Sequence, residues 1–188
     1  MSDSVAIIYH TSEGHSAEVA ERVAGRVRAG GLTVDLFAVQ TAPATLHGHA
    51  AAIIGGPIHL GHHDKLLEGY VRNHVQELGS MPSAFFSVSL TASDPSPEAQ
   101  ATAGAVVHDL LDRAGWEPDM VALFGGALAY TKYGFIKRQL IKRIAAKEGG
   151  QTDTSRDWDR TDWAAVDAFA DDFATHVVGV REAAPPPP

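Results

Sequence analysis

The sequence has no cysteine among its 188 residues. Without a thiol the protein cannot form a disulfide, a thiolate nucleophile or a cysteine-ligated metal site. No segment approaches the roughly 20 consecutive apolar residues that cross a bilayer. Residues 1–3 lead into a predicted strand and do not resemble a signal peptide. These absences are compatible with a cytoplasmic protein, which is what we expect.

Basic residues are scarce: 15 Lys and Arg stand against 23 Asp and Glu, so the formal net charge is -8. This charge disfavours non-specific binding to nucleic acid, and we expect no nucleic-acid partner. The hydrophobic content of 45% is sufficient for one normal core. We expect a single domain over residues 1–180, since domains commonly hold about 100–200 residues, and a Pro-rich disordered tail over residues 181–188.

The chain begins with a short apolar run, residues 5–9, which predicts a strand buried on both faces. A helical pattern follows over residues 17–28, with Val19, Val23 and Val27 on one side. The loop between them carries small and polar residues. These are Thr11, Ser12, Glu13, Gly14, His15 and Ser16.

This loop has the composition of a phosphate-binding site. Hydroxyls of Thr11, Ser12 and Ser16, together with free amides at a helix N-terminus, would converge on one anion. Gly14 allows close approach or positive φ, and Glu13 is expected to point into solvent because a carboxylate repels a phosphate. The loop lacks the lysine of a P-loop and the three glycines of a dinucleotide fingerprint. An ordinary turn in which Ser16 only caps the helix remains the alternative.

Strands and helices alternate along the rest of the chain. Further strands are predicted over residues 32–39, 51–56, 83–90 and 120–126, and helices over residues 65–78, 98–114 and 161–177. The pattern indicates an α/β fold with a doubly wound, five-stranded parallel sheet. In the flavodoxin-like strand order 2-1-3-4-5, ligands lie beyond the carboxyl ends of the strands. The loops at residues 10–16, 57–63 and 90–97 should therefore line one crevice.

An insertion of residues 127–160 separates the fifth strand from the last helix, which is long for such a connection. Residues 130–147 contain six of the 15 Lys and Arg residues and no acidic residue. This pattern predicts a basic amphipathic helix that could meet anionic lipid or an acidic ligand. A helix packed on its own domain with a solvated charged face is the alternative. The candidate contacts to substrate or membrane are Tyr130, Lys132, Tyr133, Lys137 and Arg138.

Four stretches carry a resemblance to a known family. They are residues 11–16, 55–62, 80–90, and 126–130 with 149–154 and 161–163. Over about residues 4–177 the chain resembles the flavodoxin superfamily, and within it the menaquinone-dependent protoporphyrinogen IX dehydrogenases. It departs from that branch at His59, where an arginine is expected.

The resemblance implies an FMN-dependent oxidoreductase that oxidises protoporphyrinogen IX to protoporphyrin IX with a quinone acceptor in haem biosynthesis. The implied partners are a porphyrinogen or quinone, with peripheral contact at the inner face of the cell membrane. The residues expected to hold FMN are Thr11, Ser12, Glu13, Gly14, His15, Ser16, Pro57, Ile58, His59, Leu60, Gly61, Ser89, Leu90, Thr91, Ala92 and Ser93. His59 is the candidate group for taking a proton.

Two other functions fit the same fold. A flavodoxin-type electron carrier suits the acidic surface but needs no basic insertion, and an NAD(P)H-dependent quinone reductase also uses FMN. A metal site at His59, His62 and His63 beside Asp64 is not expected, because no second ligand group stands at a characteristic spacing. The sequence does not predict an oligomeric state.

Overall fold

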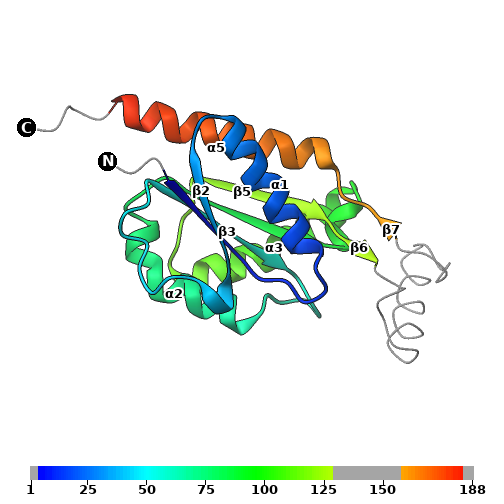
Figure 1. Ribbon diagram of the computed structural model, residues 1–188. Helices are drawn as coiled ribbons and strands as arrows, with labels where there is room; N and C mark the ends of the chain where they lie inside the picture. Colours follow the sequence, from blue (N-terminus) through cyan, green and yellow to red (C-terminus); the bar gives the residue numbers. More distant parts are fainter. Residues whose placement is uncertain (1–3, 129–157, 184–188) are drawn as a thin grey trace, which may run out of the picture.

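The computed structural model describes residues 4–128 and 158–183 (Figure 1). Its main sheet has five parallel strands in the order β2-β1-β3-β4-β5, as predicted. The strands are β1 Ser4–Tyr9, β2 Thr33–Ala38, β3 Ala51–Pro57, β4 Ser83–Ser89 and β5 Met120–Gly125. The two edge strands, β2 and β5, are only partly buried, whereas β3 and β4 are buried throughout.

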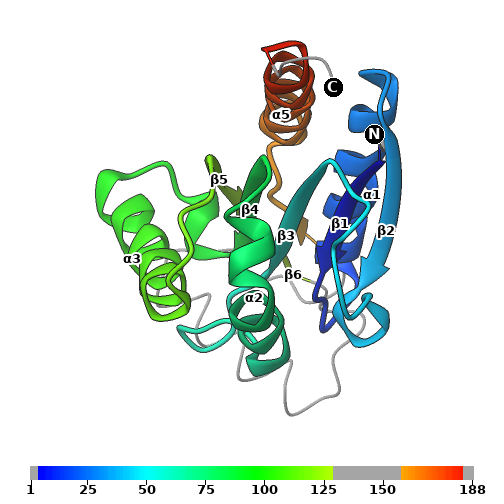
Figure 2. The same ribbon diagram turned by 90° about the vertical axis from the view of Figure 1, so that its left-hand side faces the viewer.

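Helices cover both faces of this sheet (Figure 2). The helices are α1 His15–Ala29, α2 Lys65–Leu78, α3 Pro97–Ala114 and α5 Trp163–Ala183, with 3-10 turns η1 Val39–Thr41 and η2 Thr91–Ser93. The apolar sides of α1 and α5 pack with one face, and those of α2 and α3 with the other. Alternation along β1 explains the two cores, because Val5 and Ile7 join the first cluster while Ala6 and Ile8 join the second.

Strands β1, β3 and β4 are consecutive neighbours, so their carboxyl ends lie at one edge of the sheet. Backbone hydrogen bonds continue the ladder past the strand ends: the amide of His10 donates to Gly55 at 2.9 Å, and that of Ile58 to Val88 at 2.9 Å. The three polar loops predicted to share one edge therefore start side by side. This part of the prediction is confirmed.

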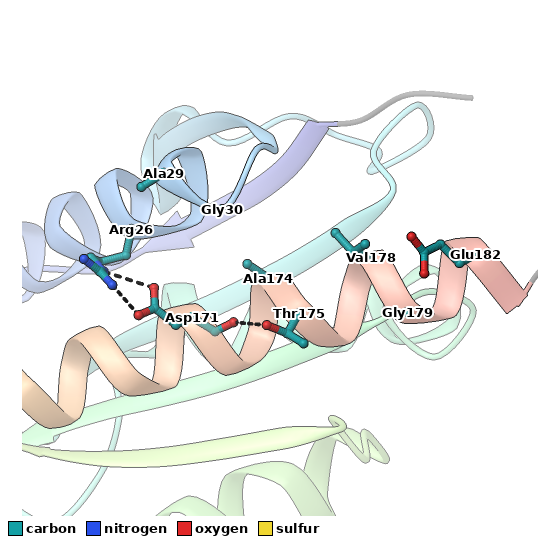
Figure 3. A pocket seen from close by; sticks show the side chains of 9 residues that line it. All are labelled: Arg26, Ala29, Gly30, Asp171, Ala174, Thr175, Val178, Gly179 and Glu182. Atoms are coloured by element: carbon teal, nitrogen blue, oxygen red, sulfur yellow. Dashed lines mark hydrogen bonds and ion pairs between the residues drawn. The ribbon is translucent and has the colours of Figure 1, made fainter.

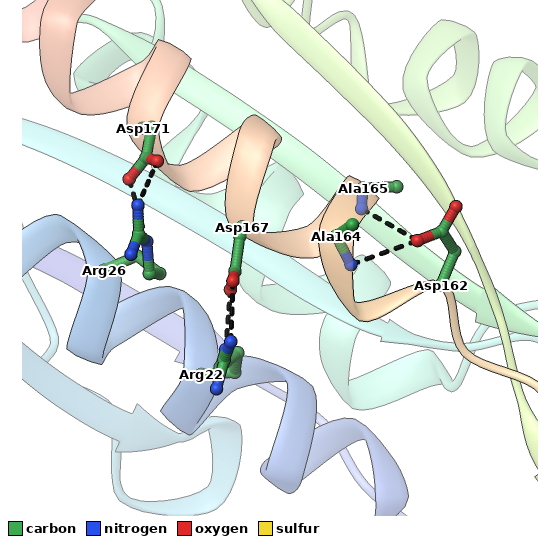
Figure 4. Close-up of polar contacts among 7 residues, drawn as sticks. All are labelled: Arg22, Arg26, Asp162, Ala164, Ala165, Asp167 and Asp171. Atoms are coloured by element: carbon green, nitrogen blue, oxygen red, sulfur yellow. Dashed lines mark hydrogen bonds and ion pairs between the residues drawn. The ribbon is translucent and has the colours of Figure 1, made fainter.

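Helices α1 and α5 are also joined by charge (Figure 4). The Arg22 guanidinium donates to both oxygens of Asp167 at 2.6 Å, and Arg26 makes the same fork with Asp171. Hydrogen bonding to Asp167 raises the pKa of Arg22, and the same bond lowers the pKa of Asp167. Both pairs are partly exposed, so they align the helices more than they stabilise the fold.

The insertion leaves and returns through a short antiparallel ladder that sequence reasoning did not predict. Strand β6 Ala127–Leu128 pairs with β7 Trp158–Asp159. The carbonyl of Arg160 lies 2.4 Å from the place of a Cβ on Gly125, so only glycine permits this approach. The pairing joins residues about 30 apart, which local pattern reasoning cannot show. Residues 129–157, including Tyr130, lie outside the described part.

Helix α5 is longer than predicted, continuing to Ala183 instead of ending at residue 177. The expected start of the tail at residue 181 is therefore wrong. Arg181, Glu182 and Ala183 are good helix formers, and the prolines that break a helix begin at residue 185. Residues 184–188 lie outside the described part. Among the described residues, no helix is both long and apolar enough to cross a membrane.

Candidate functional site

The N-terminus of α1 has the features of an anion site. Gly14 immediately precedes the helix with φ 97° and ψ -23°, a left-handed conformation that a residue with a Cβ rarely adopts. No side chain caps the helix at this position. The first amides of a helix have no partner within the helix. Positive helix-end charge and backbone donors are thus left at the edge where the loops meet.

The other described helices cap themselves. Asp64 accepts a hydrogen bond from the amide of Leu66 at 2.8 Å to cap α2, and Ser96 caps α3 through Ala99. Asp162 accepts from the first amides of α5, at 3.0 and 3.1 Å (Figure 4). Capping of α1 by Ser16, the alternative interpretation of the loop, is wrong, since Gly14 holds the cap position and no side chain bonds there.

Residues of the first loop differ in access. Ser12 is exposed, Ser16 is buried in the first turn of α1, and Thr11 and Glu13 are half-buried. Glu13 is thus less open to solvent than expected. The Thr11 hydroxyl accepts from the amide of Gly14 at 2.9 Å, which leaves its O–H free to donate elsewhere. Three hydroxyl residues therefore surround the uncapped helix end, and Thr11 fixes the turn while keeping a donor.

The second loop forms a tight turn. The backbones of His59 and His62 bond to each other, at 2.9 and 3.2 Å, around Leu60 and Gly61. Both central residues have positive φ, 52° and 81°, the geometry of a type I′ turn. Such a value is strained for leucine, and the Leu60 side chain is 93% exposed. The turn therefore presents an apolar side chain at the loop edge, beside the exposed His59.

The third loop is held by hydrogen bonds within the loop and from α3. The Ser89 hydroxyl accepts from the amide of Ala92 at 3.1 Å, and Ser93 donates to the carbonyl of Leu90 at 2.5 Å. Gln100 of α3 donates to the carbonyls of Ala92 and Asp94, at 3.0 and 2.7 Å. These bonds set the shape of residues 89–94 before any ligand binds. Sequence reasoning missed Gln100, because its role depends on the loop folding back over α3.

Two buried imidazoles lie beneath the second loop. His63 is 1% exposed, packs edge-on against Phe85 with ring centroids 5.3 Å apart, and reaches Ser87 at 3.4 Å. Burial lowers the pKa of His63 to about 4. His10 is also buried, with Nε2 3.9 Å from Asp64. The second loop therefore rests on His63, which is neutral at pH 7. Among the described residues, no group of three or more His, Cys, Asp or Glu side chains could hold a metal ion.

His15, at the start of α1, contacts the chain that returns from the insertion. Its Nε2 lies 2.7 Å from the hydroxyl of Thr161 and 3.9 Å from Asp159. Its ring also meets Trp163 edge-on, with centroids 6.0 Å apart. Sequence reasoning gave Thr161 no role. The only signal was its place in the stretch of residues 161–163 that carries the family resemblance.

A cavity of about 520 Å³ lies away from these loops, between the C-terminal halves of α1 and α5 (Figure 3). Its lining includes Arg26, Ala29, Asp171 and Glu182. Both helices reach the amino edge of the sheet there, whereas ligands of doubly wound sheets bind at the carboxyl edge. We therefore assign the candidate site to the three loops and not to this cavity.

The predicted site residues of the three loops all lie at the carboxyl edge. Those predicted to contact substrate or membrane lie outside the described residues; they are Tyr130, Lys132, Tyr133, Lys137 and Arg138. Their role stays a prediction. Binding of FMN by the loop residues likewise stays a prediction.

Comparison with known proteins agrees with this fold. A family model described as "Flavodoxin domain" matches residues 6–155. A Leishmania major protein named "Protoporphyrinogen IX dehydrogenase [quinone]" is 35% identical over 89% of this chain and 73% of its own length. A protein of the same name from Escherichia coli K12 is 32% identical, covering 89% of this chain and 93% of that protein.

Solved structures show the same fold at lower identity. Oxidised flavodoxin 1 from Bacillus cereus superposes with a TM-score of 0.56 at 13% identity, covering 92% of this chain and 98% of that one. Rubredoxin oxygen:oxidoreductase from Desulfovibrio gigas gives 0.58 at 16% identity, covering 97% of this chain and 38% of that one. The family match and the strand order agree, and this chain belongs to the flavodoxin domain family, among the relatives named protoporphyrinogen IX dehydrogenase [quinone].

Proposed function

We propose that this protein is an FMN-dependent oxidoreductase that converts protoporphyrinogen IX to protoporphyrin IX and passes the electrons to a quinone. The proposal rests chiefly on the relatives of that name, which match 89% of the chain at 32–35% identity. The loops at the carboxyl edge support the cofactor part of the proposal independently, through the chemistry of their donors.

The first loop suits a phosphate monoester. Amides at the uncapped end of α1 and the hydroxyls of Thr11 and Ser12 are neutral donors, and Gly14 removes the Cβ that would narrow the approach. A donor set without lysine fits a terminal phosphate better than the triphosphate of ATP. Ser16 is buried, so it supports the turn and offers its amide more readily than its hydroxyl.

The second and third loops suit a flat ring. Backbone groups of residues 57–61 and 89–93 would meet the polar edge of the isoalloxazine, and Leu60 offers apolar surface beside it. Neither loop contains an aromatic residue, so a face of the ring is left for a second flat molecule. A quinone is flat and can stack there, and a porphyrinogen, whose pyrroles are joined by saturated carbons, can lay one pyrrole ring against the same face.

Bound FMN supplies the redox chemistry, and the protein supplies position and charge. His59 is exposed at the first position of the turn, where its imidazole can take up a proton that leaves the porphyrinogen. Lys132, Lys137 and Arg138 would pair with substrate propionates or with anionic lipid at the membrane that holds the quinone, with Tyr130 and Tyr133 nearby in sequence.

The decisive experiment is anaerobic mixing of the FMN-loaded protein with protoporphyrinogen IX and a menaquinone analogue. Porphyrin fluorescence should appear faster than in a control without protein, and should depend on the quinone. A rate equal to the protein-free control, with the flavin still oxidised, would exclude the dehydrogenase. Flavin reduction by NADPH at a faster rate than by the porphyrinogen would favour a quinone reductase instead.

A further inference from the structure

We propose that Thr161 and Asp159 are positioning residues of the cofactor site. They hold His15, and through it the N-terminus of α1, in the geometry that receives the FMN phosphate. The inference rests on the proposed function only for the identity of the ligand. Asp159 lies at the end of the insertion and Thr161 directly after it, 144 and 146 positions away from His15 in sequence, yet both contact its side chain.

The hydrogen-bond directions at Thr161 follow from its acceptor. The Thr161 hydroxyl is 2.9 Å from the carbonyl oxygen of Gly125, which can only accept, so the hydroxyl donates there. The hydroxyl oxygen must then accept from His15 Nε2, at 2.7 Å. His15 therefore carries a proton on Nε2, and its Nδ1 lies 3.4 Å from the carboxylate of Glu18.

Asp159 holds Thr161 in place. One carboxylate oxygen accepts from the Thr161 amide at 2.9 Å, and the other from the indole N–H of Trp163 at 2.8 Å. Burial works to raise the pKa of Asp159, but these hydrogen bonds and the nearby His15 outweigh it and leave that pKa below its usual value. Asp159 is thus an anion at neutral pH that ties the end of β7 to the start of α5.

The contacts link two parts of the site. His15 is the first residue of α1 and follows Gly14 directly, so holding its ring fixes the direction of the amides at the helix end. Gly125 ends β5, beside the third loop, and the insertion returns over it. A ligand bound at the helix end would therefore strengthen the contacts of His15 with Thr161 and Asp159. Those contacts would in turn strengthen binding of the ligand.

The test compares two ligands that differ only in the phosphate. Thr161→Val removes both hydrogen bonds and keeps the shape of the side chain. We expect the Kd for FMN to rise about tenfold, as for the loss of about one net hydrogen bond. The Kd for riboflavin should change less than about twofold. Thr161→Ser should restore the preference for FMN. Titration of flavin fluorescence on the apoprotein gives both constants.

A matched control is available on α5, the helix that follows Thr161. The Thr175 hydroxyl donates to the carbonyl of Asp171 at 2.9 Å, so Thr175→Val removes a hydrogen bond of equal length far from the loops. It should leave both constants unchanged. If Thr161→Val weakened the binding of FMN and riboflavin equally, so that the ratio of their Kd values was unchanged, the positioning role would be overturned.

A second readout does not depend on any flavin. Nitrogen-15 NMR of the apoprotein should show His15 protonated on Nε2, and Thr161→Val should lose that signature while Thr161→Ser keeps it. An Nδ1–H tautomer in the wild type would overturn the inference. His15 could be protonated on Nε2 as expected while the wild-type protein fails to prefer FMN to riboflavin. In that case the first loop is not a phosphate site, and the proposed function fails with it.

Discussion

The N-termini of α1 and α2 lie at the same edge of the sheet, but only the first amides of α2 are capped by a side chain. Helix α2 satisfies itself: Asp64 caps its amides, and buried His63 supports the loop before it. Helix α1 begins at Gly14 in a left-handed conformation, with no side-chain cap. Because unsatisfied helix amides cost stability, the difference indicates that α2 completes the fold while α1 is left open for a ligand.

The difference extends to how each end is held. The amides at the α2 end are capped from the same loop, by Asp64 to Leu66. The α1 end is held from a distance, through His15 and Thr161. A self-capped helix end satisfies its amides from its own loop, whereas an end that binds a ligand leaves its amides open and must be oriented by the surrounding fold. The predictions below separate these two designs.

The largest expected effect is on the α2 side, from His63. Its folded pKa of about 4 lies below the ordinary value of 6.5, so the unfolded chain takes up this proton first as pH falls. The contribution of neutral His63 is therefore present above about pH 6.5 and is lost between there and pH 4. The loss should be roughly 2–3 kcal/mol in the free energy of unfolding.

Urea unfolding of the wild type and His63→Gln across pH 4–7 tests this effect. The carboxylates titrate alike in both proteins, so the difference between the two curves isolates the imidazole. Parallel curves would show that His63 is not held neutral.

The next effect is on the α1 side. Gly14→Asp places a carboxylate at the open cap, where it can satisfy the helix amides and repel a phosphate. We expect the Kd for FMN to rise about 100-fold, equivalent to about 2.7 kcal/mol. Gly14→Asn has nearly the same shape without the charge and should cost much less, which separates repulsion from steric strain. Equal losses for Asp and Asn would mean that no anion binds at this helix end.

Removing the Asp64 cap of α2 should affect stability and not FMN affinity. Asp64→Ala deletes the hydrogen bond to Leu66 and should lower the stability of the protein by about 1 kcal/mol, as N-cap deletions commonly do. The Kd for FMN should stay within about twofold, because neither the phosphate nor the α1 end is touched. Thermal unfolding and flavin titration measure the two quantities. A large loss of FMN affinity would show that the two helix ends are not independent.

The smallest effect is expected from the ion pairs between α1 and α5. Arg26→Gln breaks the fork with Asp171, which is partly exposed and screened by solvent (Figure 4). The melting temperature should fall slightly at low salt and be nearly unchanged at high salt. FMN affinity should not change. A salt-independent drop as large as that of Asp64→Ala would contradict this interpretation.

The sequence by itself determined the fold and the positions along the chain of the three loops that form the candidate site. Apolar runs such as residues 5–9 and the helical spacing of Val19, Val23 and Val27 are local signals, because burial depends on the period of each segment. The three loops followed from strand order alone, and the family resemblance is confirmed by the relatives.

Only the tertiary structure decided how the site is held. That Gly14 and not Ser16 holds the cap position depends on backbone dihedrals, and that Gln100 braces the third loop depends on where the chain turns back. The contact of His15 with Thr161 joins segments more than 100 residues apart. Local patterns report which face of an element is buried, but contacts between distant segments form only when the whole sheet brings their ends to one edge.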